Sequence, residues 1–265
     1  MNILIIGRGR VGTALRRSLQ ASGAHDVVAV GRRWTSARVR AADAVIIASS
    51  DDSIETVAQA LAPDLDRDAT VLHCAGARGT DELRACEACG AAVGVMHPLV
   101  SFPSTRHSPS LRGTTFTANG SRRAIATSRR IAQACGARVA VAQTGDPLYH
   151  AAAALTANGA AALAFLSVGV LERLGFSKRA AERAIGGLLR SVGDNVQSLG
   201  VPSALTGPVA RGEAQTVTAH RKALRSASRD VLAGYDAVLP IIVKCAKAAG
   251  LPQAKASRIL RTRKR

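Results

Sequence analysis

The sequence is poor in aromatic residues and in paired cysteines. Only 3% of its 265 residues are aromatic, although 47% are hydrophobic, so the core must be built from Ala, Val, Leu and Ile. Five cysteines stand at irregular spacings, which excludes a disulfide framework, and only Cys86 and Cys89 form a C-x-x-C pair. A zinc site needs a second such pair or a His-x-x-x-His motif, and the sequence has neither. We therefore expect no metal site, and reduced thiols in a cytoplasmic protein.

A long hydrophobic run is missing at the N-terminus. The first apolar run has four residues and ends at Gly7, so we expect no signal peptide. Residues 151–171 are uncharged over a length that spans a bilayer. They are mostly alanine, however, with interspersed polar residues and no flanking aromatic belt. We interpret them as the buried central helix of a helical domain and expect no membrane partner.

Basic residues strongly outnumber acidic ones, giving a formal net charge of +18. Residues after His150 contain 18 basic and 6 acidic side chains. One explanation of this charge is a surface that binds nucleic acid. The other is a GC-rich coding bias, which favours arginine over lysine and abundant alanine, acting on an ordinary solvated surface. We favour the second interpretation. Residues 255–265 have six basic side chains and no acid, which predicts a frayed tail.

A glycine-rich motif opens the chain. An apolar strand over residues 3–6 leads directly into G-x-G-x-x-G, followed by a helical pattern. In a dinucleotide-binding turn the first glycine allows the sharp turn, the second admits the pyrophosphate, and the third allows close helix packing. The free N–H groups of the helix then face the phosphates. The predicted cofactor-binding residues here are Gly7, Arg8, Gly9, Arg10, Val11 and Gly12, although the two arginines could equally be solvated.

The second predicted strand, residues 27–30, ends without an acidic residue. NAD-binding proteins usually have Asp or Glu at this position to bind the ribose 2′-hydroxyl. This chain has Arg32 and Arg33 instead. A guanidinium pairs with a 2′-phosphate through charge-assisted hydrogen bonds, so we predict that both arginines bind NADP(H). The alternative is that they are two surface arginines in an arginine-rich protein.

Strand and helix patterns alternate in the first half of the chain and predict a doubly wound, Rossmann-like α/β domain over residues 1–147. Parallel strands are expected at 3–6, 27–30, 44–48, 70–74, 92–96 and 114–118, with an edge strand at 138–142. Helices are expected at 11–22, 54–61, 80–89 and 121–135. Residues 144–147 are rich in turn formers and predict a hinge. An all-α substrate and dimerisation domain with a basic tail is expected over 148–265, with helices at 148–174, 177–198, 206–211, 213–221, 226–243 and 252–261.

Ligands of doubly wound sheets bind beyond the carboxyl ends of the strands, so polar residues there are candidates for the site. Ser49, Ser50 and Asp52 follow the third strand and are predicted to bind the cofactor. His97 and Ser101 follow the fifth and are predicted to be catalytic. A reductase needs a proton donor beside the developing alkoxide or amine, and histidine titrates near neutrality. His97 could instead bond only to backbone at the strand end.

The predicted helical domain supplies further candidates. His150 and Asn158 share a helix face by their i, i+8 spacing and are predicted to be catalytic, since an asparagine in a buried helix needs partners. A backbone carbonyl or water would also satisfy it. Thr206 and Arg211 lie in a glycine-containing loop and are predicted to bind substrate, the guanidinium pairing with a carboxylate. Arg211 could also be an ordinary surface arginine.

Several of these segments together resemble Rossmann-like proteins with a C-terminal DUF2520 domain. They are G-R-G-R-V-G, S-S-D-D-S-I, H-C-A-G-A-R-G, V-M-H-P-L-V-S-F-P, Y-H-A-A-A-A-L-T-A-N and A-L-T-G-P-V-A-R-G-E. That family is similar in layout to ketopantoate reductases, pyrroline-5-carboxylate reductases and β-hydroxyacid dehydrogenases. The resemblance implies an NADP-dependent oxidoreductase, with ketopantoate reduction as one member activity, and a helical domain that forms a homodimer. We expect its small-molecule substrate to bind between the two domains.

The chain also departs from these enzymes. Ketopantoate reductases and β-hydroxyacid dehydrogenases have a lysine four residues before the asparagine, where this chain has Ala154. The proton donor must then be His97 or His150. We expect an NADPH-dependent reductase of a small 2-oxo acid or imine. The alternatives are oxidation like that of prephenate dehydrogenases, which His97-Pro98 resembles although Val100 replaces their glycine, and a non-catalytic NADP(H) sensor with a basic partner-binding surface.

Overall fold

We analysed a computed structural model of the chain, which describes residues 1–143 and 145–264. Thr144 of the predicted hinge lies outside the described residues. The chain divides into two compact units, Met1–Leu155 and Thr156–Arg265, and each is described by itself. The predicted boundary after residue 147 falls at the start of a long helix, whereas the compact units divide within that helix. A functional boundary at 147 therefore stays a prediction.

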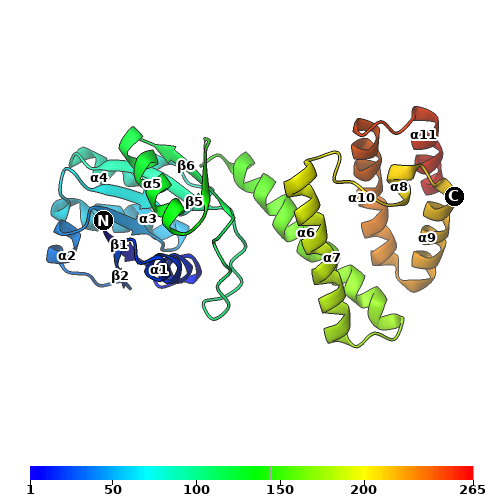
Figure 1. Cartoon of the computed structure of the whole chain (residues 1–265), viewed down its shortest axis with the longest axis horizontal. Helices are drawn as coiled ribbons and strands as arrows, with labels where there is room; N and C mark the ends of the chain where they lie inside the picture. Colours follow the sequence, from blue (N-terminus) through cyan, green and yellow to red (C-terminus); the bar gives the residue numbers. More distant parts are fainter. Residues whose placement is uncertain (144, 265) are drawn as a thin grey trace. The chain divides into compact units, whose positions relative to one another are not determined.

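The first unit is built on a seven-stranded sheet with the order β2-β1-β3-β4-β5-β6-β7 (Figure 1). The strands are β1 (Asn2–Ile6), β2 (Asp26–Val30), β3 (Ala44–Ile47), β4 (Thr70–His73), β5 (Ala92–Pro98), β6 (Thr115–Gly120) and β7 (Arg138–Val141). The pairs from β2 to β5 are parallel, and β6 pairs parallel with β7. The prediction of a wholly parallel sheet is wrong at one place, because β6 runs antiparallel to β5. No helix separates these two strands, so the chain returns along the edge without a crossover.

Helices cover both faces of this sheet, which explains why its central strands are apolar on both sides. One face packs against α1 (Arg10–Ser22) and α5 (Arg122–Ala134), and its core includes Cys74 and Cys135. The other face packs against α2 (Ser36–Arg40), α3 (Ile54–Leu61) and α4 (Arg84–Ala88), and its core includes Cys86. Short 3-10 turns precede or follow these helices at Asp51–Ser53, Ala62–Asp64 and Thr80–Leu83. The predicted helix over 80–89 is therefore a 3-10 turn leading into α4.

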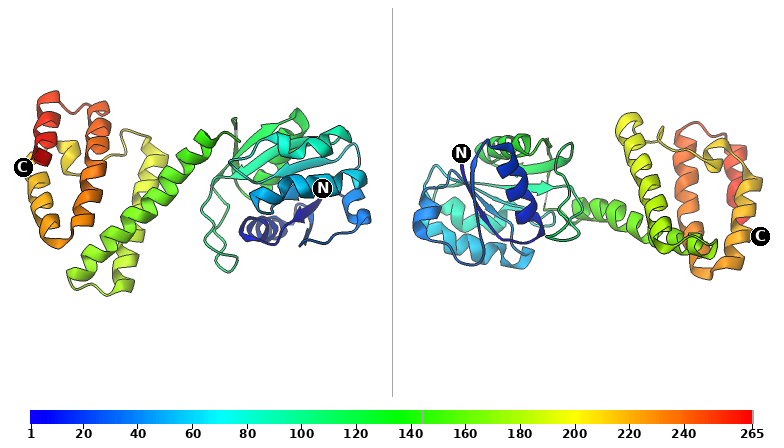
Figure 2. Two further views of the ribbon diagram at one scale, coloured as in Figure 1. Left: turned by 180° about the vertical axis from the view of Figure 1, so that it is seen from behind. Right: turned by 60° about the horizontal axis from the view of Figure 1, so that its bottom comes forward.

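The second unit is helical, as the sequence predicts. Its helices are the greater part of α6 (Pro147–Arg173), then α7 (Lys178–Leu199), α8 (Pro208–Arg211), α9 (Ala214–Ala227), α10 (Arg229–Ala248) and α11 (Gln253–Arg261), followed by a 3-10 turn at Thr262–Lys264. Helices α9, α10 and α11 lie side by side in every view (Figure 2). Their shared core includes Val217, Leu239, Val243 and Ile259.

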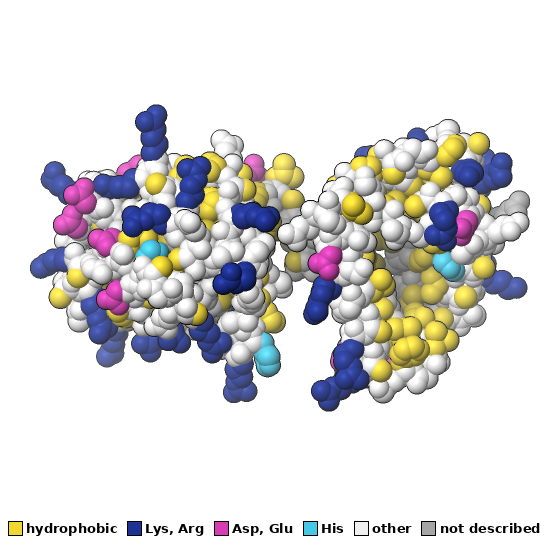
Figure 3. Space-filling view, viewed as in Figure 1, with side chains coloured by type: hydrophobic (Ala, Val, Ile, Leu, Met, Phe, Trp, Pro, Cys, Tyr) yellow, Lys and Arg dark blue, Asp and Glu magenta, His cyan; other side chains and the backbone are white. Residues whose placement is uncertain are grey.

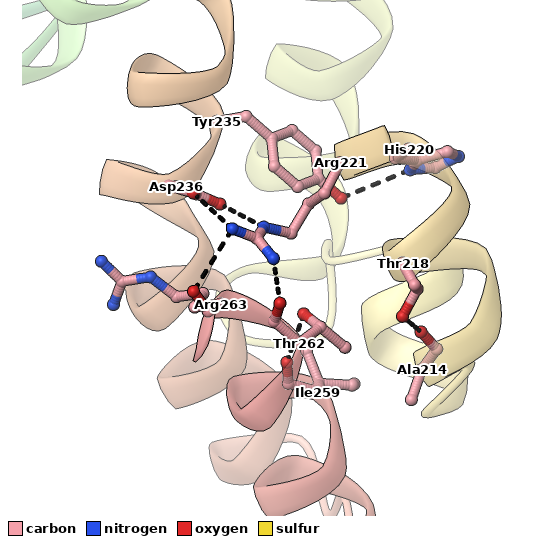
Figure 4. Close-up of polar contacts among 9 residues, drawn as sticks. All are labelled: Ala214, Thr218, His220, Arg221, Tyr235, Asp236, Ile259, Thr262 and Arg263. Atoms are coloured by element: carbon pink, nitrogen blue, oxygen red, sulfur yellow. Dashed lines mark hydrogen bonds and ion pairs between the residues drawn. The ribbon is translucent and has the colours of Figure 1, made fainter. Parts of the chain in front are cut away.

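The predicted frayed tail is wrong for the described residues, because α11 is anchored by an ion pair. Arg221 of α9 is only 6% exposed and binds both carboxylate oxygens of Asp236 on α10, at 2.8 and 2.9 Å. The same guanidinium donates to the backbone carbonyls of Thr262 and Arg263 after α11 (Figure 4). These carbonyls at a helix end have no helical partner, and a cation there also interacts favourably with the helix dipole. Arg221 thus joins three helices.

The prediction that residues 151–171 form a buried helix is also wrong. They belong to α6, which is long and apolar enough to cross a membrane, yet none of its residues is buried. An uncharged, alanine-rich sequence is compatible both with a buried helix and with a helix whose apolar side chains are exposed. Large apolar side chains of α6 and α7 are exposed, among them Leu155, Leu163, Phe165, Leu188, Leu189, Val192 and Val196.

Candidate functional site

A cavity of about 760 Å³ lies at the carboxyl ends of β1, β2 and β3. This is the edge of a doubly wound sheet where ligands bind, and the volume is that of a small-molecule site. Its lining includes Gly7, Arg8, Gly9, Arg10 and Val11 of the glycine-rich turn, Arg32 and Trp34 after β2, and Ser49, Ser50 and Asp51 after β3. The structure therefore gathers residues from three strand ends around one hollow.

The three motif glycines have different surroundings. Gly7 has a φ of +121°, and a methyl group added to it would overlap the carbonyl of Ala48. A methyl group at Gly12 would overlap the carbonyl of Gly7, so both positions exclude a side chain because of the protein itself. At Gly9 the only atom that a methyl group would approach is the carbonyl oxygen of Ala48, at 4.0 Å. The protein alone would tolerate alanine at Gly9, which lines the cavity.

The predicted cofactor arginines differ in what they contact. Arg8 donates two hydrogen bonds to the carbonyl of Ala29 at the end of β2, at 3.1 and 3.3 Å. Arg10 donates to the carbonyl of Phe102, in the loop that follows β5. Arg32 lines the cavity and is exposed, whereas Arg33 does not line it. Of the two arginines after β2, Arg32 is therefore the one that the structure places at the cavity wall, together with Arg8 and Arg10 of the glycine-rich turn.

After β3, the cavity is lined by Ser49, Ser50 and Asp51. Asp52 does not line it, because its carboxylate pairs with Arg78 at 2.8 Å. The sequence analysis missed Asp51 and Trp34. Asp51 precedes the predicted residue by one position in a 3-10 turn, and Trp34 is the single tryptophan of the chain, two residues after Arg32.

A second cluster lies at the carboxyl end of β5. His97 Nδ1 is 2.7 Å from the Tyr149 hydroxyl, and that hydroxyl is 2.7 Å from Oγ1 of Thr117 on β6. The Thr117 hydroxyl also donates to the His97 carbonyl at 3.3 Å. The His97 and Tyr149 rings meet edge to face, with centroids 5.6 Å apart. All three residues belong to the first unit. The sequence analysis missed Tyr149 and Thr117, although Tyr149 directly precedes His150 in the Y-H segment.

His97 also packs over the loop after β4. Its Cε1 and Nε2 atoms would lie 3.0 Å from a methyl group added to Gly76. In the same loop, the buried His73 accepts a hydrogen bond at Nδ1 from the Ala75 N–H, and its Nε2 lies 2.9 Å from the Gly79 carbonyl. A carbonyl only accepts, so Nε2 of His73 bears the proton. The loop after β4 and the carboxyl end of β5 are therefore held close together.

Burial governs the protonation of both histidines. It is the largest cause that lowers the pKa of His97, to about 4, while the charges of His150 and His73 lower it further and that of Asp51 raises it. Burial likewise lowers the pKa of His73, against opposing effects of the Gly79 carbonyl, Glu82 and Asp51. His97 is therefore neutral at pH 7. A neutral imidazole has one nitrogen that donates and one that accepts.

The other predicted catalytic and substrate-binding residues are described within their own units. Ser101 lies exposed in the loop after β5, and His150 is exposed on α6 beside Tyr149. Asn158 and Thr206 belong to the second unit and are exposed, so the argument that a buried Asn158 must find partners is wrong. Arg211 donates to both carboxylate oxygens of Glu213, and this carboxylate raises the Arg211 pKa. No cluster of three or more potential metal ligands occurs among the described residues.

Known proteins resemble this chain in sequence family and in fold. Residues 114–239 match the family described as "Domain of unknown function (DUF2520)". This match agrees with the resemblance to the DUF2520 family that the sequence motifs carry. A comparison with curated protein sequences finds no match.

Several solved structures share the fold. Protein TM1727 of Thermotoga maritima is 23% identical, with a TM-score of 0.67 over 93% of this chain and 99% of its own. A pyrroline-5-carboxylate reductase of Coxiella burnetii is 17% identical, with a TM-score of 0.63 over 98% of each chain. The pyrroline carboxylate reductase of Plasmodium falciparum, solved with NADP bound, is 11% identical, with a TM-score of 0.63 over 99% of this chain and 98% of its own. The predicted α/β Rossmann-like fold with a helical C-terminal region is confirmed.

Proposed function

We propose that this protein is an NADP(H)-dependent oxidoreductase acting on a small molecule. The observation that supports this most directly is the cavity at the ends of β1, β2 and β3, with Gly9 at its wall. A glycine where the protein would tolerate a methyl group fits a position that a pyrophosphate approaches closely. The reductases of similar fold, one of them bound to NADP, support the same assignment.

The residues around the cavity fit the parts of NADP(H). The free N–H groups at the start of α1 suit the pyrophosphate, and Ser49 and Ser50 offer hydroxyls to phosphate or ribose. Arg32 suits the 2′-phosphate, with Trp34 beside it offering an aromatic surface. When bound, the nicotinamide supplies or accepts a hydride. His97 is the proposed proton-transfer residue, and its loop continues to Ser101.

We also propose roles for four residues of the helical region. His150 and Asn158 are proposed to contact substrate from α6, and Thr206 with Arg211 to bind a substrate carboxylate. For Arg211 this requires a substrate that displaces Glu213, because both carboxylate oxygens of Glu213 already occupy its guanidinium. A substrate without a carboxylate would leave that pair intact.

Replacing Arg32 with aspartate is expected to abolish the preference for NADPH over NADH. The wild-type chain should bind NADPH at least tenfold more tightly than NADH, because a charge-assisted pair with the 2′-phosphate contributes at least about 1.4 kcal/mol. Arg32→Asp should lose this preference, and Arg38→Asp, on α2 outside the cavity, is the matched control. The measurement is calorimetric titration with both nucleotides.

Turnover is tested separately with NADPH and a panel of 2-oxo acids and cyclic imines, and with NADP⁺ and 2-hydroxy acids, following absorbance at 340 nm. Absence of nucleotide binding would overturn the proposal. Tight binding without turnover on any substrate would favour the alternative of an NADP(H) sensor.

We also propose that the chain forms a homodimer through α6 and α7. A second cavity, of about 650 Å³, lies within the second unit and is lined by α6, α7 and the start of α10. Hydrophobic side chains line a hollow in this part of the molecule (Figure 3). Its lining also includes Glu172, Arg173, Lys178 and Glu182, which offer both signs of charge. A surface that pairs with its own copy needs such self-complementarity, and exposed apolar patches mark interaction sites.

The dimer is expected to dissociate when a charge is placed in this cavity. Phe165 is 78% exposed and lines it, so Phe165→Asp should give monomers at micromolar concentration where the wild type sediments as a dimer. Ile241→Asp, at a similarly exposed apolar residue outside the cavity, should stay dimeric. Analytical ultracentrifugation is the measurement. A monomeric wild type, or a wild type that binds neutral lipid vesicles instead of its own copy, would contradict the proposal.

A further inference from the structure

The hydrogen bonds around Tyr149 determine which nitrogen of His97 bears the proton. The Thr117 hydroxyl has one proton, which it donates to the His97 carbonyl. Its oxygen must then accept from the Tyr149 hydroxyl, 2.7 Å away. The single Tyr149 proton is used in that bond, so the Tyr149 oxygen accepts from Nδ1 of His97. If Tyr149 donated to His97 Nδ1 instead, the Thr117 hydroxyl could donate to either Tyr149 or the His97 carbonyl, and only two of the three hydrogen bonds would form.

We propose that Tyr149 and Thr117 are positioning residues that hold His97 in its Nδ1–H tautomer, leaving Nε2 as a proton acceptor for a substrate hydroxyl. Within the described part of the chain, Nε2 makes no hydrogen bond of its own, although it packs beside Gly76. Thr117 is 5% exposed, so its hydroxyl has little access to water and depends on these partners. The neighbouring His73 has the opposite tautomer, with Nε2–H bound to Gly79.

The tautomer narrows the substrate class, and this step rests on the proposed function. When a secondary alcohol is oxidised, its O–H bond breaks and the proton passes to Nε2, while the carbonyl bond forms. The hydride that leaves the carbon in the same step is what an oxidised nicotinamide accepts. An amine, by contrast, loses hydride to give an iminium directly, and the N–H proton can pass to water afterwards, so its hydride step needs no proton acceptor. Of the two substrate classes in the proposed function, a proton acceptor at Nε2 therefore favours the 2-hydroxy acid and 2-oxo acid pair over the amine and imine pair.

The electrostatic surroundings of His97 agree with a proton acceptor. Its pKa of about 4 reflects burial first, then the charges of His150 on α6 and His73 on β4, opposed by Asp51. Only the neutral ring accepts a proton. Oxidative kcat/KM is expected to rise with pH through about 4 and then to level off before neutrality.

The tautomer can be measured without any cofactor or substrate. In the full-length, ¹⁵N-histidine-labelled protein at pH 7, long-range ¹H–¹⁵N correlations distinguish Nδ1–H from Nε2–H rings, and His97→Asn identifies the His97 signals. His97 is expected as Nδ1–H and His73 as Nε2–H. Tyr149→Phe and Thr117→Val should each remove the preference at His97. The control is Tyr235→Phe, which breaks the other histidine–tyrosine contact of the chain, between His220 and Tyr235.

Kinetics give the second readout. His97→Asn is expected to lower oxidative kcat/KM by about 10²- to 10⁴-fold, and Tyr149→Phe by roughly tenfold, with Tyr235→Phe unchanged. An Nε2–H ring in the wild type, or an Nδ1–H ring that persists in Tyr149→Phe, would overturn the inference. If the tautomer is as expected but no hydroxy acid is oxidised, the proposed function fails while the positioning roles stand.

Discussion

Gly7→Ala is expected to destabilise the first unit by more than about 4 kcal/mol, a loss that is exceptional for a single substitution. Two effects combine at this position. The positive φ of +121° is unfavourable for any side chain, and the added methyl group would overlap the Ala48 carbonyl between β1 and β3. The backbone has little freedom to move away, because the Gly7 N–H donates to the Val30 carbonyl and the Ala48 N–H donates to the Ile6 carbonyl. The free energy of unfolding, from urea titrations followed by circular dichroism, measures the loss.

Gly9→Ala is expected to impair NADPH binding without a comparable loss of stability. Gly9 has a φ of −71°, which alanine adopts freely, and open space around it. Its stability should therefore stay within about 1 kcal/mol of the wild type, while NADPH binding is lost. Gly23→Ala is the control for backbone strain alone, because Gly23 has a φ of +65° with no neighbouring atom within 4 Å. A Gly9→Ala chain that binds NADPH with unchanged affinity would refute the assignment of the cavity.

Arg221→Met is expected to destabilise the second unit by about 3–5 kcal/mol, the cost of removing one partner from a buried ion pair. The substitution leaves Asp236 without its bidentate partner, and it leaves the Thr262 carbonyl without a donor. The end of α11 then loses its attachment to α9 and α10 (Figure 4). Hydrogen exchange across α11 should accelerate together with the loss of unfolding free energy.

Two comparisons test the cause. Arg211→Met breaks an exposed pair with Glu213, so the free energy of unfolding should change much less than in Arg221→Met. The second is pH. Arg221 lowers the pKa of Asp236, so this pair stabilises the fold above the pKa of an unfolded aspartate, near 4, and the contribution is lost as pH falls through the lower folded value. Arg221→Met should weaken that acid dependence. Equal losses for Arg211→Met and Arg221→Met would show that burial is not the cause.

The local patterns in the sequence predicted most of the first unit. Each of the seven strands lies within two residues of its predicted range, because apolar runs flanked by turn formers report burial directly. The glycine motif also identified the cavity, since Gly7, Gly9 and Gly12 have roles set by backbone within a few residues. α3 occurs over the predicted residues, Ile54–Leu61. The short α2 was missed because five residues give no readable period.

What the sequence could not predict depends on contacts between distant residues. Tyr149 joins His97 only because β5, β6 and the start of α6 meet at one edge, across 52 positions of sequence. The antiparallel β6 likewise depends on how the chain returns after a helix-free segment. The exposure of α6 was missed because an alanine-rich, uncharged helix has the same composition whether its own chain or another surface covers it.

The buried thiols of the first unit have a practical consequence. Cys74 lies in the core on one face of the sheet and Cys86 in the core on the other, and burial raises the pKa of each to about 12. Thiolate is the reactive form, so both groups are inert while their layer stays closed. Cys89 is exposed, so a thiol reagent is expected to modify it in the folded protein. Modification of Cys74 by a thiol reagent therefore reports the opening of the layer that contains α1 and α5. Modification of Cys86 reports the opening of the layer that contains α2, α3 and α4.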